Sequence, residues 1–109
     1  MKFTQAYAAQ AICTPTRVAL MTGRYPARNE VGLSEPLELS DSIGLSPEIE
    51  TLSSLIKSSG YETALFGKWH LGSRPEFLPN RHGYDQFFGI SPGAADYIDH
   101  KYLSDEPIL

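Results

Sequence analysis

The chain has 109 residues, which is enough for one small hydrophobic core, and a formal net charge of −4. This mildly acidic balance, without any cluster of lysine or arginine, argues against nucleic acid as the main partner. No apolar run approaches the length of a membrane helix, and the single cysteine, Cys13, permits no internal disulfide.

The first predicted elements lie between residues 2 and 23. Residues 2–9 contain aromatic side chains and threonine, which favour a strand-like conformation. From residue 11 onward we expect a loop that enters a short helix, with Thr14 as its N-cap and Pro15 in its first turn. Gly23 is expected to end this helix.

Cys13 and Arg17 are the reactive side chains of this segment. We expect Cys13 just before the helix, where free backbone N–H groups and the helix dipole favour an anion. Arg17 lies in the first turns, so its guanidinium is close enough to point back at Cys13. The arrangement favours a negatively charged group at Cys13.

Two loops and a helix follow. Proline, glycine and asparagine predict a loop at residues 24–33, and residues 34–46 have no sustained period, which indicates a surface loop. Ser46 then caps a helix in which Pro47 is the first residue, and Gly60 is the C′ residue. The apolar side chains of this helix recur at helical spacing, and we expect their face to pack against a sheet. The residues of this face are Ile49, Leu52, Leu55 and Ile56.

A strand is predicted over residues 61–67, and the order helix, glycine, strand suggests an α/β unit. Lys68 and His70 follow this strand at once, and ligands of open α/β sheets gather beyond the carboxyl ends of the strands. The two side chains leave an extended segment on the same side, while Trp69 faces the opposite way into the packing. An ammonium and an imidazole are therefore predicted to lie side by side.

The remaining sequence is expected to supply loop and core. Residues 73–80 form a proline-containing loop. We expect His82 and Asp85 to make structural hydrogen bonds rather than to bind a metal, since no second carboxylate or histidine lies at ligand spacing nearby. Three aromatic residues are predicted to be core residues, namely Tyr84, Phe87 and Phe88.

Three segments of the chain resemble the sulfatase family. Residues 13–17, C-T-P-T-R, resemble the signature C-x-P-x-R, and residues 60–70, G-Y-E-T-A-L-F-G-K-W-H, resemble the signature G-Y-x-T-x-x-x-G-K-W-H. Residues 81–89 resemble the family segment R-x-G-[FY]-D-x-[FY]-F-G and look closest to arylsulfatase B-like members. Two signatures in the family's order are a strong signal. Thr16 stands where serine or alanine is commoner, and Phe66 is bulkier than usual, but neither removes a reactive group.

The resemblance implies an alkaline-phosphatase-like α/β fold, in which helices flank a mixed sheet. Because family members are several times longer, we expect residues 1–109 to be a fragment of one sulfatase catalytic domain, incomplete in this chain. The family also suggests a secreted, periplasmic or lysosomal parent protein.

The resemblance further implies a mechanism. The family's signature cysteine is oxidised to Cα-formylglycine by a formylglycine-generating or sulfatase-maturing enzyme, which implies the same for Cys13. One hydroxyl of the hydrated aldehyde attacks the sulfur of a sulfate ester, and the second then loses its proton so that sulfate is expelled. By resemblance, Arg17 holds the diol, Lys68 binds diol and sulfate oxygens, and His70 bonds the diol and takes the proton.

A divalent cation, calcium in most of the family, is implied by the same resemblance. Cys13, as formylglycine, is one expected ligand, and the carboxylate and amide ligands that the family places upstream and downstream are absent from this chain. His100 and Lys101 lie in a segment that resembles the next family block and are weaker candidates for binding substrate. The implied substrate is a sulfate ester, and the arylsulfatase B-like blocks suggest a sulfated sugar.

Three other functions stay open. A phosphate-ester hydrolase of the same superfamily usually carries serine or threonine as its nucleophile, so Cys13 counts against it. A cysteine hydrolase that uses Cys13 with His70 predicts inactivation by thiol alkylation. A truncated, non-catalytic product predicts anion binding at most. We expect this chain alone to be inactive, because part of a sheet leaves apolar edges uncovered.

Overall fold

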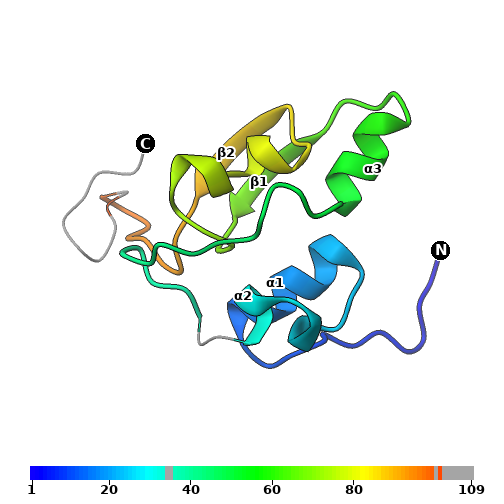
Figure 1. Ribbon diagram of the computed structural model, residues 1–109, viewed down its shortest axis with the longest axis horizontal. Coiled ribbons are helices and arrows are strands. Elements are labelled where there is room, and N and C mark those ends of the chain that lie inside the picture. Colours follow the sequence, from blue (N-terminus) through cyan, green and yellow to red (C-terminus); the bar gives the residue numbers. More distant parts are fainter. Residues whose placement is uncertain (34–35, 100, 102–109) are drawn as a thin grey trace.

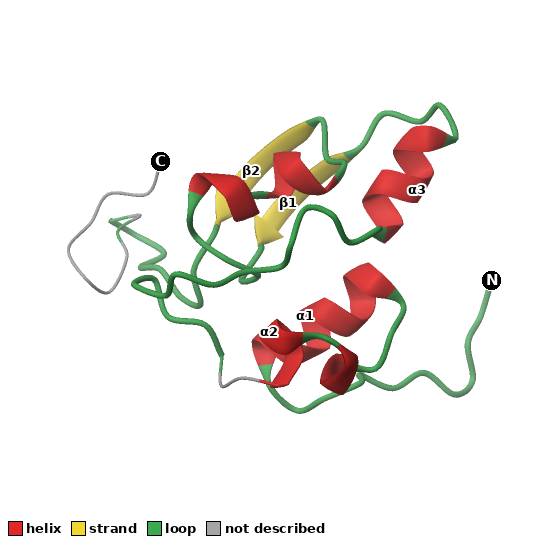
Figure 2. Cartoon of the chain, in the orientation of Figure 1, coloured by secondary structure: helices red, strands yellow, loops and turns green. Residues whose placement is uncertain are grey.

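The computed structural model describes residues 1–33, 36–99 and 101 of the chain (Figure 1). The α-helices and strands are α1 (Cys13–Thr22), α2 (Glu30–Leu33), α3 (Leu52–Ser58), β1 (Ala64–Lys68) and β2 (Gln86–Ile90). Three short 3₁₀ helices cover Pro26–Arg28, Pro75–Phe77 and Pro79–His82. Helices α1 and α2 form one side of the molecule, and the sheet lies with α3 on the other (Figure 2). The predicted α/β class is confirmed.

The sheet consists of two parallel strands among the described residues. The register pairs Ala64 with Gln86 at one end and Lys68 with Ile90 at the other. Pairing continues past the strands, because the N–H of His70 donates to the carbonyl of Ser91 at 2.9 Å. The strand predicted over residues 61–67 instead runs from Ala64 to Lys68. Strand β2 was not among the predicted elements, since its five residues carry two aromatics but no clear alternation.

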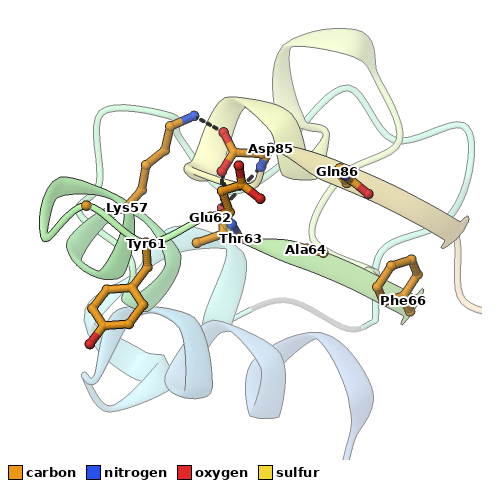
Figure 3. Close-up of a pocket in the computed structure, with 9 residues that line it drawn as sticks. Lys57, Tyr61, Glu62, Thr63, Ala64, Phe66, Asp85 and Gln86 are labelled. Carbon is orange, nitrogen blue, oxygen red and sulfur yellow. Dashed lines mark hydrogen bonds and ion pairs between the residues drawn. The ribbon is translucent and has the colours of Figure 1, made fainter.

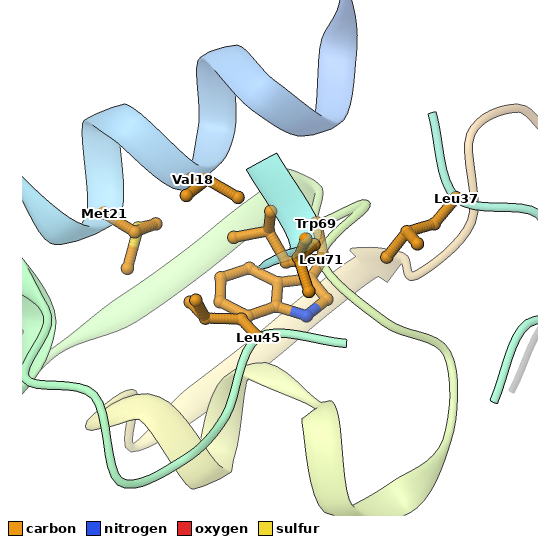
Figure 4. Close-up of a cluster of buried hydrophobic side chains, with 7 residues drawn as sticks. Val18, Met21, Leu37, Leu45, Trp69 and Leu71 are labelled. Carbon is orange, nitrogen blue, oxygen red and sulfur yellow. The ribbon is translucent and has the colours of Figure 1, made fainter. Parts of the chain in front are cut away.

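The hydrophobic core lies between α1 and the segment that follows β1 (Figure 4). Its buried members are Val18, Met21, Val31, Leu37, Leu45, Trp69 and Leu71. Trp69 is only 2% exposed, which confirms it as a packing residue. The prediction of a surface loop over residues 34–46 is wrong for two of the residues described there, because Leu37 and Leu45 enter the core. Irregular backbone can carry core side chains without any periodic signal.

Helix α1 matches the prediction at its end and differs from it at its start. Gly23 adopts a left-handed conformation, with φ of 66°, and its N–H donates to the carbonyl of Ala19, so the predicted stop is confirmed. Pro15 lies in the first turn as expected. However, Cys13 is already the first helical residue, and the N-cap is Ile12, which makes no side-chain cap. The predicted cap role of Thr14 is wrong because its hydroxyl bonds to other segments.

Helix α3 begins five residues later than predicted. The Ser46 hydroxyl accepts the N–H of Glu48 at 3.3 Å, so this serine stabilises a turn instead of a helix start. The cap is Thr51, which forms a capping box with Ser54. At the other end, Gly60 follows the C-cap with φ of 87°, as a C′ glycine should.

Thr51 also fastens α3 to the segment before β2. Its buried hydroxyl donates to the carbonyl of His82 at 2.8 Å. We predict that Thr51→Ala lowers the free energy of unfolding by about 1–2 kcal/mol, because it removes a cap and a buried hydrogen bond together. Thr51→Ser keeps the hydroxyl and should lose much less. Urea denaturation of the two variants of the full-length gene product measures the difference. Equal losses of unfolding free energy in both variants would contradict this role.

Two further predicted features are corrected. Residues 2–9 have no regular structure and are exposed, so the strand-like prediction is wrong for them. A strand needs a neighbouring strand, and the described residues provide none for this segment. The predicted loops at 24–33 and 73–80 contain short helical turns, and a proline is the first residue of each of the three 3₁₀ helices.

One face of the sheet is covered and the other is open. Leu65 and Phe87 are paired in register and pack against the core. Phe66 and Phe88 are also paired, and they are 70% and 78% exposed, so the prediction of Phe88 as a core residue is wrong. Of the apolar face predicted for the α3 region, Ile49 packs against the core, but Leu52, Leu55 and Ile56 are between 39% and 50% exposed. Alternation along a strand gives two faces, and here only one has a covering layer.

No helix in the described part of the chain is both long enough and apolar enough to cross a bilayer.

Candidate active site

The N-terminal half of α1 is bound directly to the end of β1. The Nη1 atom of Arg17 donates to the carbonyl of Lys68 at 2.5 Å, and the hydroxyl of Thr14 donates to the carbonyl of His70 at 3.1 Å. These bonds join residues that are more than fifty positions apart in the sequence. The segment that holds Cys13 is therefore placed against the segment that holds Lys68 and His70.

Cys13 is a free, half-buried cysteine at the first position of α1. A helix start presents backbone N–H groups, so the local field favours negative charge at this residue. Arg17 stands one turn further along the same helix and is also half-buried. Arg17 therefore lies close to the start of the helix, as the sequence predicts.

His70 is buried, with 4% exposure, and has an unusual backbone conformation with φ of 58°. Its Nε2 atom lies 2.7 Å from the carbonyl of Leu37, and its Nδ1 atom is buried with no hydrogen-bond partner among the described residues. Burial lowers the pKa of His70 from its ordinary value of 6.5. The hydrogen bond to Leu37 raises this pKa, and the charges of Lys68 and Arg17 lower it further. His70 is therefore a neutral imidazole at neutral pH.

Arg17 and Lys68 lie in the same part of the molecule as His70. The guanidinium of Arg17 donates to the carbonyl of Lys68, two residues before His70, and both positive charges disfavour the imidazolium form. Two positive side chains and a neutral imidazole beside the start of a helix suit an anionic group with several oxygen atoms. This arrangement can bind an anion, offset charge that develops on it and accept a proton.

Comparison with known families matches the sulfatase family over residues 1–107. The chain belongs to the sulfatase family. It is 40% identical to N-acetylgalactosamine-6-sulfatase of Rattus norvegicus over 99% of this chain, and 44% identical to steryl-sulfatase of Homo sapiens over 84% of it. The crystal structure of Ps i-CgsB superposes with a TM-score of 0.77 and 35% identity over 90% of this chain. The family expected from the two signatures is thus confirmed.

This sulfatase chain spans about a fifth of the length of its relatives. It covers 22% of the rat N-acetylgalactosamine-6-sulfatase, 17% of the human steryl-sulfatase and 22% of the Ps i-CgsB chain. The fold described above is therefore part of the sulfatase domain.

The described residues do not fit a cation site. Within residues 1–33, 36–99 and 101, no group of three histidine, cysteine or acidic side chains comes together where an ion could be held. Of the ligands that the sulfatase resemblance implies, this chain has Cys13 alone.

The two weaker site candidates, His100 and Lys101, belong to the C-terminal part of the chain. Lys101 is exposed, and its carbonyl accepts the N–H of Asp96 at 2.8 Å. His100 lies outside the described residues.

Asp85 has the structural role predicted for it. The Lys57 ammonium lies 2.6 Å from one carboxylate oxygen, and the backbone N–H of Thr63 donates to the other at 2.9 Å. The hydrogen bond from Lys57, followed by those from Thr63, holds the pKa of Asp85 below its ordinary range. These residues line a hollow of ≈ 800 Å³ at the amino end of β1, and none of Cys13, Arg17, Lys68 and His70 borders it (Figure 3).

His82 differs from its prediction. Both ring nitrogens are buried without a hydrogen-bond partner among the described residues, and the ring lies 5.2 Å from that of Trp69. Burial lowers the pKa of His82, and the carbonyl of Phe77, which accepts the indole N–H of Trp69, raises it by less. Its backbone carbonyl, rather than its ring, makes the hydrogen bonds, which come from Thr51 and Ser53.

Acid should therefore weaken the fold through His82. Its pKa in the folded state lies below its unfolded value, so its contribution is complete above about pH 6.5 and is lost as the pH falls from there through the lower folded-state pKa. We predict that the free energy of unfolding of His82→Phe falls less between about pH 7 and pH 5 than that of the wild type. His70, whose pKa is also lowered, contributes to the slope that remains. Identical slopes in urea titrations would contradict this prediction.

Two residues at the site were missed by sequence reasoning. Thr14 was assigned to a cap, although its place beside Cys13 in the signature was a signal that it lies at the site. Leu37 contributes only its backbone, to Thr14 and to His70, and no side-chain pattern reveals such a contact.

Proposed function

We propose that this chain is part of an enzyme that hydrolyses sulfate esters at Cys13, with Arg17, Lys68 and His70 as further catalytic residues. The observation that carries the proposal is the pair of hydrogen bonds from Arg17 and Thr14 to the carbonyls of Lys68 and His70. They bring the two sulfatase signatures together at one place, although each signature alone is compatible with a structural role.

Arg17 and Lys68 bind the anionic group in this proposal. The guanidinium of Arg17 uses one donor on the Lys68 carbonyl, which fixes its position and leaves its other donors for an oxyanion. Lys68 supplies a compact positive charge from the last position of β1. Since both groups are placed before substrate binds, they offset developing charge without reorganisation.

His70 acts as the base. It is neutral because burial and two nearby cations lower its pKa, so it can accept a proton at neutral pH. We assign the proton acceptance to the step that releases sulfate.

Cys13 carries the covalent chemistry after oxidation to formylglycine by a maturing enzyme. When present, the hydrated aldehyde supplies a hydroxyl nucleophile and a second hydroxyl that allows sulfate to be released, which divides the hydrolysis into two easier steps. The calcium ion implied by the family stays part of the proposal for the parent enzyme alone, because the described residues do not form its site.

A sulfated carbohydrate is the substrate class that the relatives favour. Ps i-CgsB was crystallised with k-i-k-neocarrahexaose, and that complex superposes with a TM-score of 0.77 at 34% identity. A relative with 40% identity is named an N-acetylgalactosamine-6-sulfatase. We extend the sugar class, and no particular sugar, to this chain.

Sulfate release from the full-length gene product tests the proposed function. The protein is produced with a formylglycine-generating enzyme and given matched aryl sulfate and aryl phosphate esters. We expect release of sulfate at a much higher rate than release of phosphate. Faster phosphate release would favour the phosphate-ester hydrolase, and turnover of neither ester would favour the non-catalytic product.

The 109-residue chain by itself should not turn over sulfate esters. It presents the paired Phe66 and Phe88 to solvent and lacks most of the length of its relatives. Uncovered apolar strands also predict aggregation of the isolated chain. Metal-dependent sulfatase activity from the purified chain would contradict this expectation.

A further inference from the structure

Three hydrogen bonds close a ring through Thr14, Leu37 and His70. The Thr14 hydroxyl donates to the His70 carbonyl at 3.1 Å and accepts the N–H of Leu37 at 3.1 Å. The imidazole Nε2 of His70 completes the ring at the carbonyl of Leu37, at 2.7 Å. All three residues are buried, and Thr14 has no exposed surface at all. The ring joins α1, the segment before α3 and the residue just beyond β1.

This ring of hydrogen bonds determines which nitrogen of the His70 imidazole carries the proton. A carbonyl oxygen can only accept, so the short contact with Leu37 requires a hydrogen on Nε2. In a neutral imidazole the other nitrogen, Nδ1, then has a free lone pair. That atom is buried, and no described residue donates to it. The lowered pKa of His70 agrees with the neutral form.

The backbone and a glycine hold the ring of His70 in place. His70 has φ of 58°, a left-handed conformation that few residues other than glycine adopt. On the other side, a Cβ atom at Gly93 would lie 2.8 Å from Cε1 of His70, so only glycine leaves room for the imidazole. The surroundings thus fix the imidazole of His70. The hydroxyl of Thr14 bonds both to the N–H of Leu37 and to the carbonyl of His70.

We propose that Thr14 is a positioning residue, which holds His70 with its proton on Nε2 and leaves Nδ1 as the nitrogen that accepts a proton. This inference deepens the proposed function and rests on it for the role of the accepted proton. Thr14 acts through Leu37 and the His70 backbone, and its side chain takes no part in the chemistry. The residue that follows the signature cysteine therefore acts on the base more than fifty positions away.

Nitrogen NMR of the full-length gene product with ¹⁵N-labelled histidine tests the assignment. His70→Gln identifies the signals of His70 by their loss. We expect the wild type to show Nε2 protonated and Nδ1 unprotonated at neutral pH. Thr14→Ser keeps the hydroxyl and should preserve this pattern, while the isosteric Thr14→Val should give a mixture of tautomers or a shifted ring. Thr22→Val removes a hydroxyl bonded to the carbonyl of Val18 in the same helix and serves as the control that leaves His70 unchanged.

Kinetics add a second readout. For Thr14→Val we expect kcat to fall about tenfold, a part of the roughly 10²–10⁴-fold that a general base contributes, with KM nearly unchanged and the rate restored in Thr14→Ser. A wild-type His70 protonated on Nδ1 overturns the proposal even if Thr14→Val fails to fold, as does a Thr14→Val enzyme with unchanged tautomer and kcat. If the tautomer pattern is found but no ester is hydrolysed, the proposed function fails while the ring's control of the tautomer stands.

Discussion

Replacing Cys13 by alanine should abolish sulfate-ester hydrolysis in the full-length gene product. Without the thiol, no aldehyde can form at position 13, and the covalent route that splits the reaction into two steps is lost. We expect kcat to fall by at least about 10³-fold, since removal of a nucleophile usually leaves only the contribution of binding and charge stabilisation. Release of sulfate from an aryl sulfate measures the loss.

The matched control for this variant is Thr16→Ser. Its hydroxyl donates to the carbonyl of Gln10 at 2.6 Å, and serine retains that bond at a position where the family more often has a small residue. We expect Thr16→Ser to keep wild-type activity within a few-fold and Cys13→Ala to unfold at the same urea concentration as the wild type. Full activity in a stably folded Cys13→Ala protein would exclude Cys13 as the source of the nucleophile.

Arg17→Met should have the second-largest effect and should reduce both activity and stability. The guanidinium makes one of the two hydrogen bonds described above between α1 and the segment at the end of β1, and its positive charge also attracts the anionic substrate. We expect kcat/KM to fall about 10²–10³-fold, as when one preorganised donor to an oxyanion is removed. The free energy of unfolding should fall by about 1.5–3 kcal/mol, the range for hydrogen bonds that involve a charged group.

Two variants separate these effects. Arg17→Lys keeps the charge but loses the planar fork, so it should recover part of the activity and little of the stability. Arg24→Met removes an exposed arginine just beyond α1 and should change neither quantity. If Arg17→Met and Arg24→Met behave alike in kinetics and in urea denaturation, Arg17 has no role at the site.

The sequence allowed the prediction of features that depend on local chemistry. Gly23 ends α1 because a left-handed residue there has no steric cost, and Pro15 fits a first turn, in which its missing N–H is not needed. Trp69 was predicted as a packing residue from its place between two polar side chains in an extended segment. The family was predicted from motif residues whose spacing reflects chemistry rather than packing.

Features that depend on distant partners were not predictable in this way. Ser46 was predicted as the cap, but Thr51 takes that position because Ser54 completes its capping box and the His82 carbonyl accepts its hydroxyl. Threonine is a common cap residue, yet the hydroxyl of Thr14 makes its hydrogen bonds with His70 and Leu37. A side chain with one donor and few acceptor sites can serve either local or distant groups, and the choice is made by the tertiary fold.

Mass spectrometry of the tryptic peptide Phe3–Arg17 from the full-length gene product tests the central claim most directly, because this peptide contains Cys13 as its only cysteine. The protein is produced with and without a formylglycine-generating enzyme, treated with a thiol-alkylating reagent and with an aldehyde-specific probe, and assayed in parallel. The account predicts that the active protein carries an aldehyde at residue 13, labels with the aldehyde probe and resists alkylation. A protein that hydrolyses sulfate esters with an unmodified thiol at residue 13, and that loses its activity on alkylation, would contradict the account and identify a cysteine hydrolase.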